Sequence, residues 1–263
     1  MSTGKSLPAN YLKDYLKVAP ISHSVWRAAE AKELSKIDLP PPTLDVGCGF
    51  GEFAGVFFDS MIEVGIDISL PDVLQAKQGK KYRRVECIDA KKMPFRSNSF
   101  ASILSVSVLE HISRVDEVLA EIYRVLKVGG IFIFTVPSNR FSSELIGHKF
   151  FKAVGLNRLS RLYSYIVNLT FRHHNLWSKA TWEKQLRQQG FTVNQVKSIV
   201  PFPVFRVWEL GLPLALPSQL GKLLWGKRFV VRPPGLVPFL TLLLRPLSQA
   251  RGTGTNWLII ARK

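Results

Sequence analysis

Three glycines and a nearby aspartate are the first residues of this chain whose types and spacing predict chemistry. Gly47, Gly49 and Gly51 recur at every second position directly after the apolar segment that contains Asp45. A turn this sharp needs backbone conformations that a Cβ forbids, and it lets a ligand approach the bare main chain. The expected ligand is a nucleotide or a nucleoside.

Two further aspartates end short apolar segments later in the chain. Asp67 lies 20 residues after Gly47, the separation at which a carboxylate reaches the ribose hydroxyls of a nucleoside held over a glycine turn. Asp89 ends the next such segment. Because ligands bind beyond the carboxyl ends of parallel strands, Asp45, Asp67 and Asp89 are expected on one rim. A solvent-facing loop acid is the alternative for Asp67.

The segments around these residues predict a doubly wound α/β fold. Apolar stretches expected as strands alternate with stretches of helical periodicity as far as residue 136, which is typical of a mostly parallel sheet with helices on both faces. A pair of glycines, Gly129-Gly130, is expected to end the helix before the fifth strand. Strands are expected before Gly47 and over 63–67, 84–88, 101–106 and 131–136, and helices over 11–18, 24–36, 71–77, 117–127 and 179–189.

Five motifs in this order resemble those of class I S-adenosylmethionine-dependent methyltransferases of the broad small-molecule and lipid type. They are LDVGCGFGEF, GIDIS, CIDAKKMPFRSNSF, VLEHI and EIYRVLKVGGIFIFTVPS, which together cover Thr43 to Ser138. The resemblance implies a Rossmann-like sheet of seven strands with the last one antiparallel, and it makes 191–200 and 256–262 the final two strands. A dehydrogenase is disfavoured, although Gly49-x-Gly51-x-x-Ala54 also fits a dinucleotide motif, because no residue pair for hydride transfer stands out.

The resemblance also implies S-adenosyl-L-methionine as the cofactor and suggests which residues hold its methionine end. Gly47, Gly49 and Gly51 would approach that end, and Asp45 would help to hold the amino group. The backbone at Ser105 would contact the methionine moiety.

The nucleoside end would be held by residues after the second and third strands. The resemblance implies that Asp67 takes the ribose hydroxyls and that Ile68 packs on the adenine. Asp89 and Ala90 would meet the adenine edge.

Histidines are the candidate proton acceptors. His111 follows the fourth expected strand, and with an unperturbed pKa it would suit a general base for an acceptor that must lose a proton. A histidine that only orders its loop is the alternative. His173, His174 and Trp177 form a second group, for which a substrate-pocket role and an ordinary surface role both stay open. No Cys/His set has ligand spacing, so no metal site is expected.

The net charge of +17 is concentrated in the second half of the chain. Residues 1–131 contain 17 Lys/Arg and 16 Asp/Glu, whereas residues 132–263 contain 19 and 3. This asymmetry favours an acidic partner surface, either anionic lipid or nucleic acid, over a merely soluble basic face.

Four regions are expected along the chain. They are an N-terminal helical appendage (1–42), a core (43–206) with a lid insertion over about 141–177, an apolar-basic insertion (207–255) and a final core strand (256–263). In the insertion, cations and a tryptophan interrupt leucine-rich runs, which is typical of interfacial membrane attachment. A helical subdomain packed on the sheet is the alternative. The interrupting residues are Lys222, Trp225, Lys227, Arg228 and Arg232.

These features together predict methyl transfer to a hydrophobic or lipid-linked acceptor at a membrane surface. An isoprenoid quinone, another prenyl or pigment-like molecule, or a lipid-linked sugar would fit. RNA methylation is an alternative, although the cations accompany leucine-rich runs rather than polar loops with stacking aromatics. A cofactor-binding assembly factor without catalysis is another. Two isolated cysteines and no signal-peptide pattern after Met1 favour a cytoplasmic protein that is peripheral on the membrane.

Overall fold

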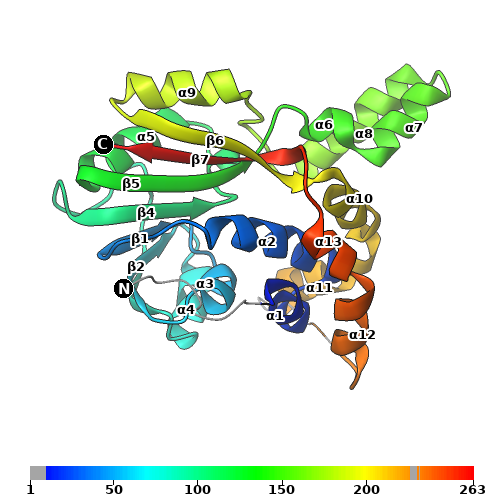
Figure 1. The fold of residues 1–263 in the computed structure, drawn as a ribbon, viewed down its shortest axis with the longest axis horizontal. Helices are drawn as coiled ribbons and strands as arrows, with labels where there is room; N and C mark the ends of the chain where they lie inside the picture. Colours follow the sequence, from blue (N-terminus) through cyan, green and yellow to red (C-terminus); the bar gives the residue numbers. More distant parts are fainter. Residues whose placement is uncertain (1–9, 226–229, 231) are drawn as a thin grey trace.

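A seven-stranded sheet forms the centre of the molecule (Figure 1). The computed structural model describes residues 10–225, 230 and 232–263, without the side chains of 219, 220 and 222–225. The strand order is β3-β2-β1-β4-β5-β7-β6, and only β7 runs antiparallel to its neighbours, which confirms the expected mostly parallel sheet. The strands are β1 (Thr43–Val46), β2 (Ile62–Asp67), β3 (Tyr82–Cys87), β4 (Phe100–Val106), β5 (Leu126–Pro137), β6 (Thr192–Pro201) and β7 (Gly254–Arg262).

Two hydrophobic layers lie on the two faces of this sheet. Successive strand residues point to opposite faces, so that Ile103 and Phe132 enter one layer while Leu104 and Ile133 enter the other. Helices α5 and α9 close the first layer, and α1, α2, α3 and α10 close the second. The helices are α1 (Tyr11–Val18), α2 (Ile21–Leu34), α3 (Glu52–Phe57), α4 (Leu70–Gln78), α5 (Val115–Val125), α6 (Phe141–Glu144), α7 (Ile146–Ala153), α8 (Asn157–Thr170), α9 (Lys179–Gln188), α10 (Phe202–Leu210), α11 (Leu212–Trp225), α12 (Leu236–Leu243) and α13 (Arg245–Gln249).

The expected helix stop at Gly129-Gly130 is wrong. Helix α5 already ends at Val125, and both glycines lie inside β5. The pairing of β5 with β4 shifts register between Phe100 and Ser102, and Gly129 has a φ of +76°. The two glycines therefore accommodate an irregularity of a long strand.

Helices α7 and α8 form a hairpin that projects from the body of the molecule (Figure 1). We define the α7–α8 hairpin as residues 146–170. The sequence predicted a lid over about 141–177. The structure has three helices there, none of which contributes a described residue to the cavities at the carboxyl ends of β1 and β2.

The apolar-basic region 207–255 forms helices around α1 and α2. Arg232, expected to meet lipid headgroups, instead donates to the backbone oxygens of Leu16 and Ala19 at the end of α1. Lys227 and Arg228 lie outside the described residues, as do the side chains of Lys222 and Trp225. Among the helices that the structure describes, none has the length and apolarity needed to cross a bilayer.

Candidate active site

The glycine turn after β1 adopts the backbone conformation that its sequence predicts. Gly47, Gly49 and Gly51 have φ values of +78°, +52° and +80°, which favour glycine. A Cβ on Gly47 would lie 2.5 Å from the Val108 side chain, whereas a Cβ on Gly49 would meet nothing within 4 Å. Gly49 therefore leaves its main chain open to a ligand, and Gly47 allows the turn to pack closely.

Two cavities lie beside this turn, and Gly47 lines both of them. The larger, of about 310 Å³, is bordered by residues that follow β2 and β3 and by the loop after β4. The smaller, of about 100 Å³, lies between the turn and helix α2. The expected residues in the larger cavity are Gly47, Asp67, Ile68, Asp89, Ala90 and His111, and those in the smaller are Asp45, Gly47 and Gly49.

Asp67 is fixed at the carboxyl end of β2 by two backbone donors. Its Oδ2 accepts the N–H of Gly49 and its Oδ1 accepts the N–H of Ser69, each at 2.9 Å. Ile68 beside it is 71% exposed and offers an apolar surface to the cavity. Asp89 remains largely solvent-accessible and lies 3.4 Å from the Lys91 ammonium.

Asp45 is buried beneath the turn. Its Oδ2 accepts a hydrogen bond from the Tyr82 hydroxyl at 2.7 Å. Burial raises the pKa of Asp45 to about 6, although the hydrogen bond from Tyr82 acts in the opposite direction. The carboxylate is thus ionised at neutral pH and becomes protonated under mildly acidic conditions.

Helix α2 contributes a cation to the smaller cavity that sequence analysis missed. Arg27 lines this cavity, and its guanidinium donates to Glu30 Oε2 at 2.9 Å. Glu30 is fully buried, and its Oε1 accepts from the hydroxyls of Ser107 and Thr135. The i, i+3 spacing of Arg27 and Glu30 was visible in the sequence, but nothing there distinguished a buried pair from an exposed one.

His111 lies on the wall of the larger cavity with 40% of its side chain exposed. Its Nδ1 is 3.4 Å from the backbone oxygen of Arg172, which favours the tautomer with the proton on Nδ1. Partial burial lowers the pKa of His111, so the expectation of an unperturbed pKa is wrong. Burial raises the pKa of the neighbouring Glu110 to about 8 and keeps that carboxyl neutral at pH 7.

His173 joins His111 to an aromatic cluster. The two imidazoles stack with centroids 5.7 Å apart, and the Phe141 ring meets His173 edge-on at 4.8 Å. Burial, with the charges of His111 and His174, lowers the pKa of His173 to about 3, so it stays neutral near pH 7. The cluster, as defined here, contains His173, Trp26, Phe141, Phe171, Phe205 and Trp208.

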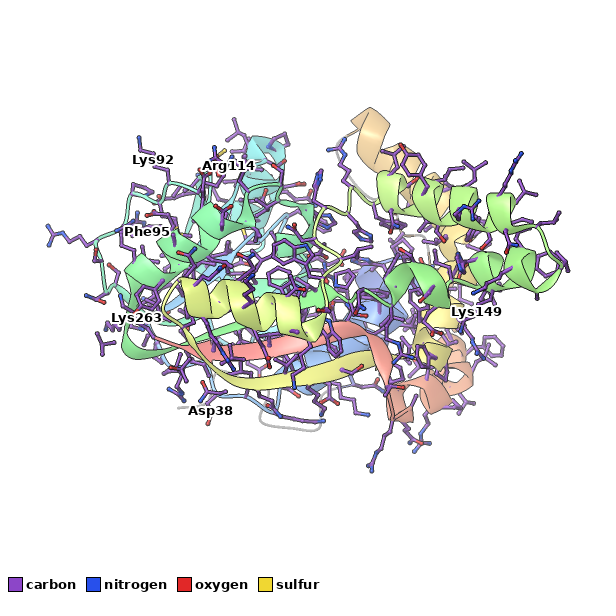
Figure 2. All side chains as sticks on the ribbon, turned by 90° about the horizontal axis from the view of Figure 1, so that it is seen from above. Asp38, Lys92, Phe95, Arg114, Lys149 and Lys263 are labelled. Carbon is purple, nitrogen blue, oxygen red and sulfur yellow. The ribbon has the colours of Figure 1, made fainter. Side chains whose placement is uncertain are left out.

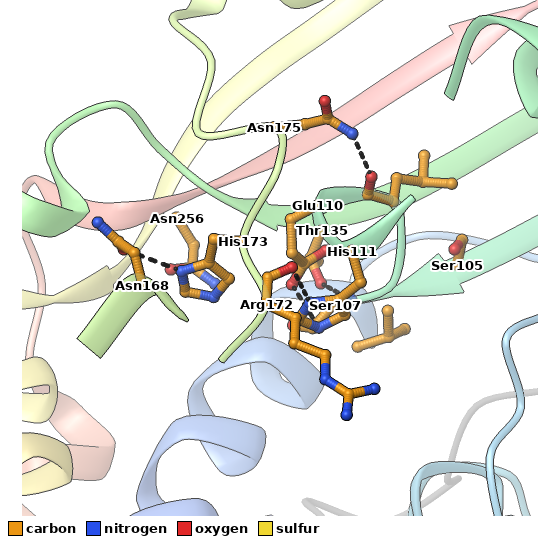
Figure 3. A network of polar contacts seen from close by, with 12 residues as sticks. Ser105, Ser107, Glu110, His111, Thr135, Asn168, Arg172, His173, Asn175 and Asn256 are labelled. Atoms are coloured by element: carbon orange, nitrogen blue, oxygen red, sulfur yellow. Dashed lines mark hydrogen bonds and ion pairs between the residues drawn. The ribbon is translucent and has the colours of Figure 1, made fainter. Parts of the chain in front are cut away.

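Asn175, another residue that sequence analysis missed, ties this segment to the loop after β4. Its side-chain amide donates to the backbone oxygens of Leu109 and Ile112 at 2.8 and 2.7 Å. Figure 3 shows Asn175 and one of these contacts. The backbone N–H groups of His174 and Asn175 both donate to the backbone oxygen of Glu110. This clamp sets the position of His111 relative to the aromatic cluster.

The remaining expected residues line neither cavity. Ser105 is buried and its hydroxyl donates to the Val46 oxygen, and Gly51 allows α3 to begin close to Ala76 of α4. His174 is exposed, and Trp177 packs on Trp182 on the α9 side of the sheet. A separate cavity of about 690 Å³ lies between α1, α2, α12 and α13 and contains none of the expected residues.

The segment that forms these cavities is similar to known methyltransferases. A sequence profile for the methyltransferase domain matches residues 44–134. Malonyl-[acyl-carrier protein] O-methyltransferase of Legionella pneumophila is 30% identical over 134 residues, which cover 48% of this chain and 47% of that protein. A solved S-adenosylmethionine-dependent methyltransferase of Thermotoga maritima, described as a possible histamine N-methyltransferase, superimposes with a TM-score of 0.57 at 18% identity, over 92% of this chain and 91% of that one. Residues 44–134 thus match a methyltransferase domain, and the chain resembles S-adenosylmethionine-dependent methyltransferases over this segment and in its fold.

Relatives in this methyltransferase family act on diverse acceptors. The 24-methylenesterol C-methyltransferase 2 of Arabidopsis thaliana is 33% identical over 124 residues, which cover 43% of this chain and 34% of that protein. The chain therefore spans half or less of the length of both of these relatives. The matched part is the nucleotide fold. At 18% identity, the likeness to the solved structure shows a shared fold alone.

The two cavities fit the family's cofactor, S-adenosyl-L-methionine. The space above Gly49 admits a ligand against bare main chain, and the Arg27 and Asp45 side chains suit the carboxylate and ammonium of an amino acid. The larger cavity combines the Asp67 carboxylate, which suits the hydroxyls of a ribose, with the apolar surface of Ile68. Its volume of about 310 Å³ suits a nucleoside.

Proposed function

We propose that this protein transfers the methyl group of S-adenosyl-L-methionine to a hydrophobic or lipid-linked small molecule at a membrane surface. The aromatic cluster beside His111 supports this most directly. Within it, His173 stacks on His111 at the cavity wall, and Phe141 and the α10 rings are buried behind His173, so this wall is backed by an apolar, aromatic layer that suits a hydrophobic acceptor. The protein would act as a peripheral protein on the cytoplasmic face of the membrane.

The residues of the chain would align the two reactants and accept one proton from the acceptor molecule. Bound S-adenosyl-L-methionine supplies a methyl group activated by a positively charged sulfonium. Asp67 and Arg27 would anchor the two ends of the cofactor, and the aromatic cluster would keep water from the acceptor. His111 would accept a proton at Nε2 from a hydroxyl or similar acceptor, because its Nδ1–H is directed at the Arg172 oxygen.

Two further observations agree with an apolar acceptor. One relative is named for a methylenesterol, and a geranyl diphosphate methyltransferase has a related fold with a TM-score of 0.50 at 16% identity, over 92% of this chain and 90% of that one. The second half of the chain carries 19 Lys/Arg against 3 Asp/Glu, which suits an anionic membrane surface.

Radiolabel transfer tests this proposal. The purified protein is incubated with methyl-tritiated cofactor and either a total lipid extract or total RNA, and the label is then counted in each fraction. Label in the organic extract is expected. Label in RNA, or intact cofactor binding without any transfer, would exclude the proposed acceptor class in favour of RNA methylation or a non-catalytic binding protein.

A His111→Gln variant tests the proton acceptor. Glutamine keeps a polar side chain at the cavity wall but cannot accept a proton at neutral pH, so transfer to a protic acceptor is expected to fall by roughly 10²–10⁴-fold. The affinity for the demethylated cofactor, measured by calorimetry, is expected to stay unchanged. Unaltered transfer would leave His111 with a loop-ordering role only.

A further inference from the structure

Helix α8 of the α7–α8 hairpin buries two serines together with Val167 and leaves several aliphatic residues exposed. Ser160 and Ser164 of α8 are buried against α7, whereas Leu162, Ile166 and Leu169 are 50%, 51% and 62% exposed. In a helix that covers a protein core the arrangement is the reverse. The exposed apolar residues follow helical spacing and form one stripe, here called the outer stripe, which consists of Leu159, Leu162, Ile166 and Leu169.

Specific hydrogen bonds keep the polar side closed. His148 Nδ1 lies 2.8 Å from the Ser164 hydroxyl, and the Ser160 hydroxyl donates to the His148 backbone oxygen. Asn168 donates to the Ser142 hydroxyl at 2.8 Å. Because these groups are satisfied by α7 and α6, rotating α8 to bury the outer stripe would leave them without partners.

The root of the hairpin is fixed to α10 by one buried carboxylate. Glu209 accepts the backbone N–H groups of Ile146 and Gly147 at the beginning of α7, and it accepts the Tyr163 hydroxyl from α8. A carboxylate at this position also suits the positive end of the α7 helix dipole. The hairpin is thus held in its projecting orientation (Figure 1).

The charges beside the outer stripe have one sign. No Asp or Glu occurs between Leu145 and Phe171. Lys152, Arg158 and Arg161 are exposed, and none of them pairs with a carboxylate in the part of the chain that the structure describes. A second copy of the hairpin would offer these cations no carboxylate, because its own sequence contains none, so a two-fold dimer through the stripe is disfavoured. Anionic headgroups complement these cations.

We infer that the outer stripe of the α7–α8 hairpin inserts into the interfacial layer of an anionic phospholipid bilayer, with Lys152, Arg158 and Arg161 at the headgroups. An apolar helix face flanked by cations is the arrangement that binds a membrane parallel to its surface. This inference rests on the proposed membrane-surface function and assigns the contact to the hairpin rather than to 207–255.

Flotation of the full-length protein with vesicles of phosphatidylcholine and phosphatidylserine tests the assignment. The variant Leu162→Gln/Ile166→Gln/Leu169→Gln is expected to bind these vesicles roughly 100-fold more weakly, because three exposed apolar side chains no longer enter the bilayer. The matched control Leu242→Gln/Leu243→Gln alters α12 residues that are 69% and 60% exposed, and it is expected to float like the unaltered protein. Unchanged affinity for the demethylated cofactor verifies that each variant is folded.

A charge variant tests the headgroup contact. Arg158→Gln/Arg161→Gln is expected to weaken binding to the anionic vesicles roughly 20-fold at low salt. Arg83→Gln/Lys127→Gln removes the same charge from exposed strand positions outside the hairpin and is expected to have little effect.

Each alternative outcome has a distinct meaning. If the hairpin variants float normally, or if only the α12 control loses binding, the assignment to the hairpin is overturned while label transfer to lipid extract still supports the proposed function. If the unaltered protein transfers label to lipid but never floats, the membrane-surface part of the proposed function is overturned together with this inference. If the unaltered protein does not float but forms a dimer that only the stripe variant dissociates, a second copy is the occupant of the stripe. That result would also overturn the inference.

Discussion

The raised pKa of Asp45 predicts that cofactor binding depends on pH. Only the ionised carboxylate attracts an ammonium group, and burial raises the pKa of Asp45 to about 6. We therefore expect affinity for the demethylated cofactor to fall as the pH decreases through 6, by up to about tenfold per pH unit. Calorimetry between mildly acidic and neutral pH measures this. Asp45→Asn should bind weakly at every pH, and an unaltered slope in this variant would assign the titration to another group.

The neutral state of Glu110 predicts an opposite dependence for stability. Burial raises its pKa from 4.5 to about 8, so folding favours the protonated carboxyl. The stabilisation that this gives is complete below the ordinary pKa and is lost as the pH rises through 8. Glu110→Gln mimics the neutral carboxyl, and we expect its thermal midpoint to rise relative to that of the unaltered protein as the pH increases from about 4.5 to 8, with a constant difference above pH 8. Parallel midpoints at all pH values would contradict this prediction.

Two glycines of one turn are expected to respond differently to the same substitution. Gly47→Ala adds a Cβ that meets Val108 at 2.5 Å, and together with the positive φ this should lower the free energy of unfolding by roughly 2–5 kcal/mol. Gly49→Ala adds a Cβ in open space and should cost only about 1–2 kcal/mol from its positive φ. Because that space is where the cofactor would lie, Gly49→Ala should still lose cofactor affinity. Denaturant titration and calorimetry separate the two effects.

At the scale of elements, α2 is the helix that joins the N-terminal segment to the site. Its Glu30 accepts from Arg27, from Ser107 after β4 and from Thr135 of β5. Glu30→Ala leaves the Arg27 guanidinium without this partner, and we expect the free energy of unfolding to fall by roughly 3–5 kcal/mol. Glu33→Ala on the same helix removes surface pairs with Lys36 and Lys197 and should cost less than about 1 kcal/mol. Equal losses would show that the Glu30 network contributes little.

Elements that depend on local periodicity could be predicted from the sequence. Helix 11–18 has the predicted bounds, and the expected strands coincide with β1 to β5 apart from their ends. The last two strands, β6 and β7, were implied by the family resemblance. The glycine turn was predictable because three positive φ values require a residue without a Cβ. The stop at Gly129-Gly130 failed because a pair of glycines fits a strand irregularity as well as a helix end.

Contacts between distant segments could not be predicted. Arg27 reaches the smaller cavity only because α2 packs against the sheet, and Asn175 holds the loop after β4 from more than sixty positions away. The outer stripe of α8 has helical spacing in the sequence, but periodicity gives an apolar face without saying whether that face is covered. Which face of α8 is inside depends on the partners of Ser160 and Ser164.

At the scale of the whole molecule, the cofactor cavities and the hairpin occupy different regions. Lys92 and Arg114 each follow a residue that lines the larger cavity. They lie on the opposite side of the molecule from Lys149 of the hairpin (Figure 2). With two separate surfaces, the protein would bind cofactor and membrane independently. Binding of the demethylated cofactor should therefore have the same affinity with and without anionic vesicles.

Hydrogen exchange maps both surfaces in one experiment. Anionic vesicles should slow amide exchange in 146–170 by at least about tenfold, because the hairpin amides become shielded from water, while the amides of β1 and β4 keep their rates. The demethylated cofactor should instead slow exchange at Gly49 and around Asp67. Raising the salt concentration should reverse the vesicle effect, since headgroup contacts are screened, and should leave the cofactor effect unchanged. Protection by vesicles that spares 146–170 and falls on α12 would place the membrane contact in the apolar-basic region instead.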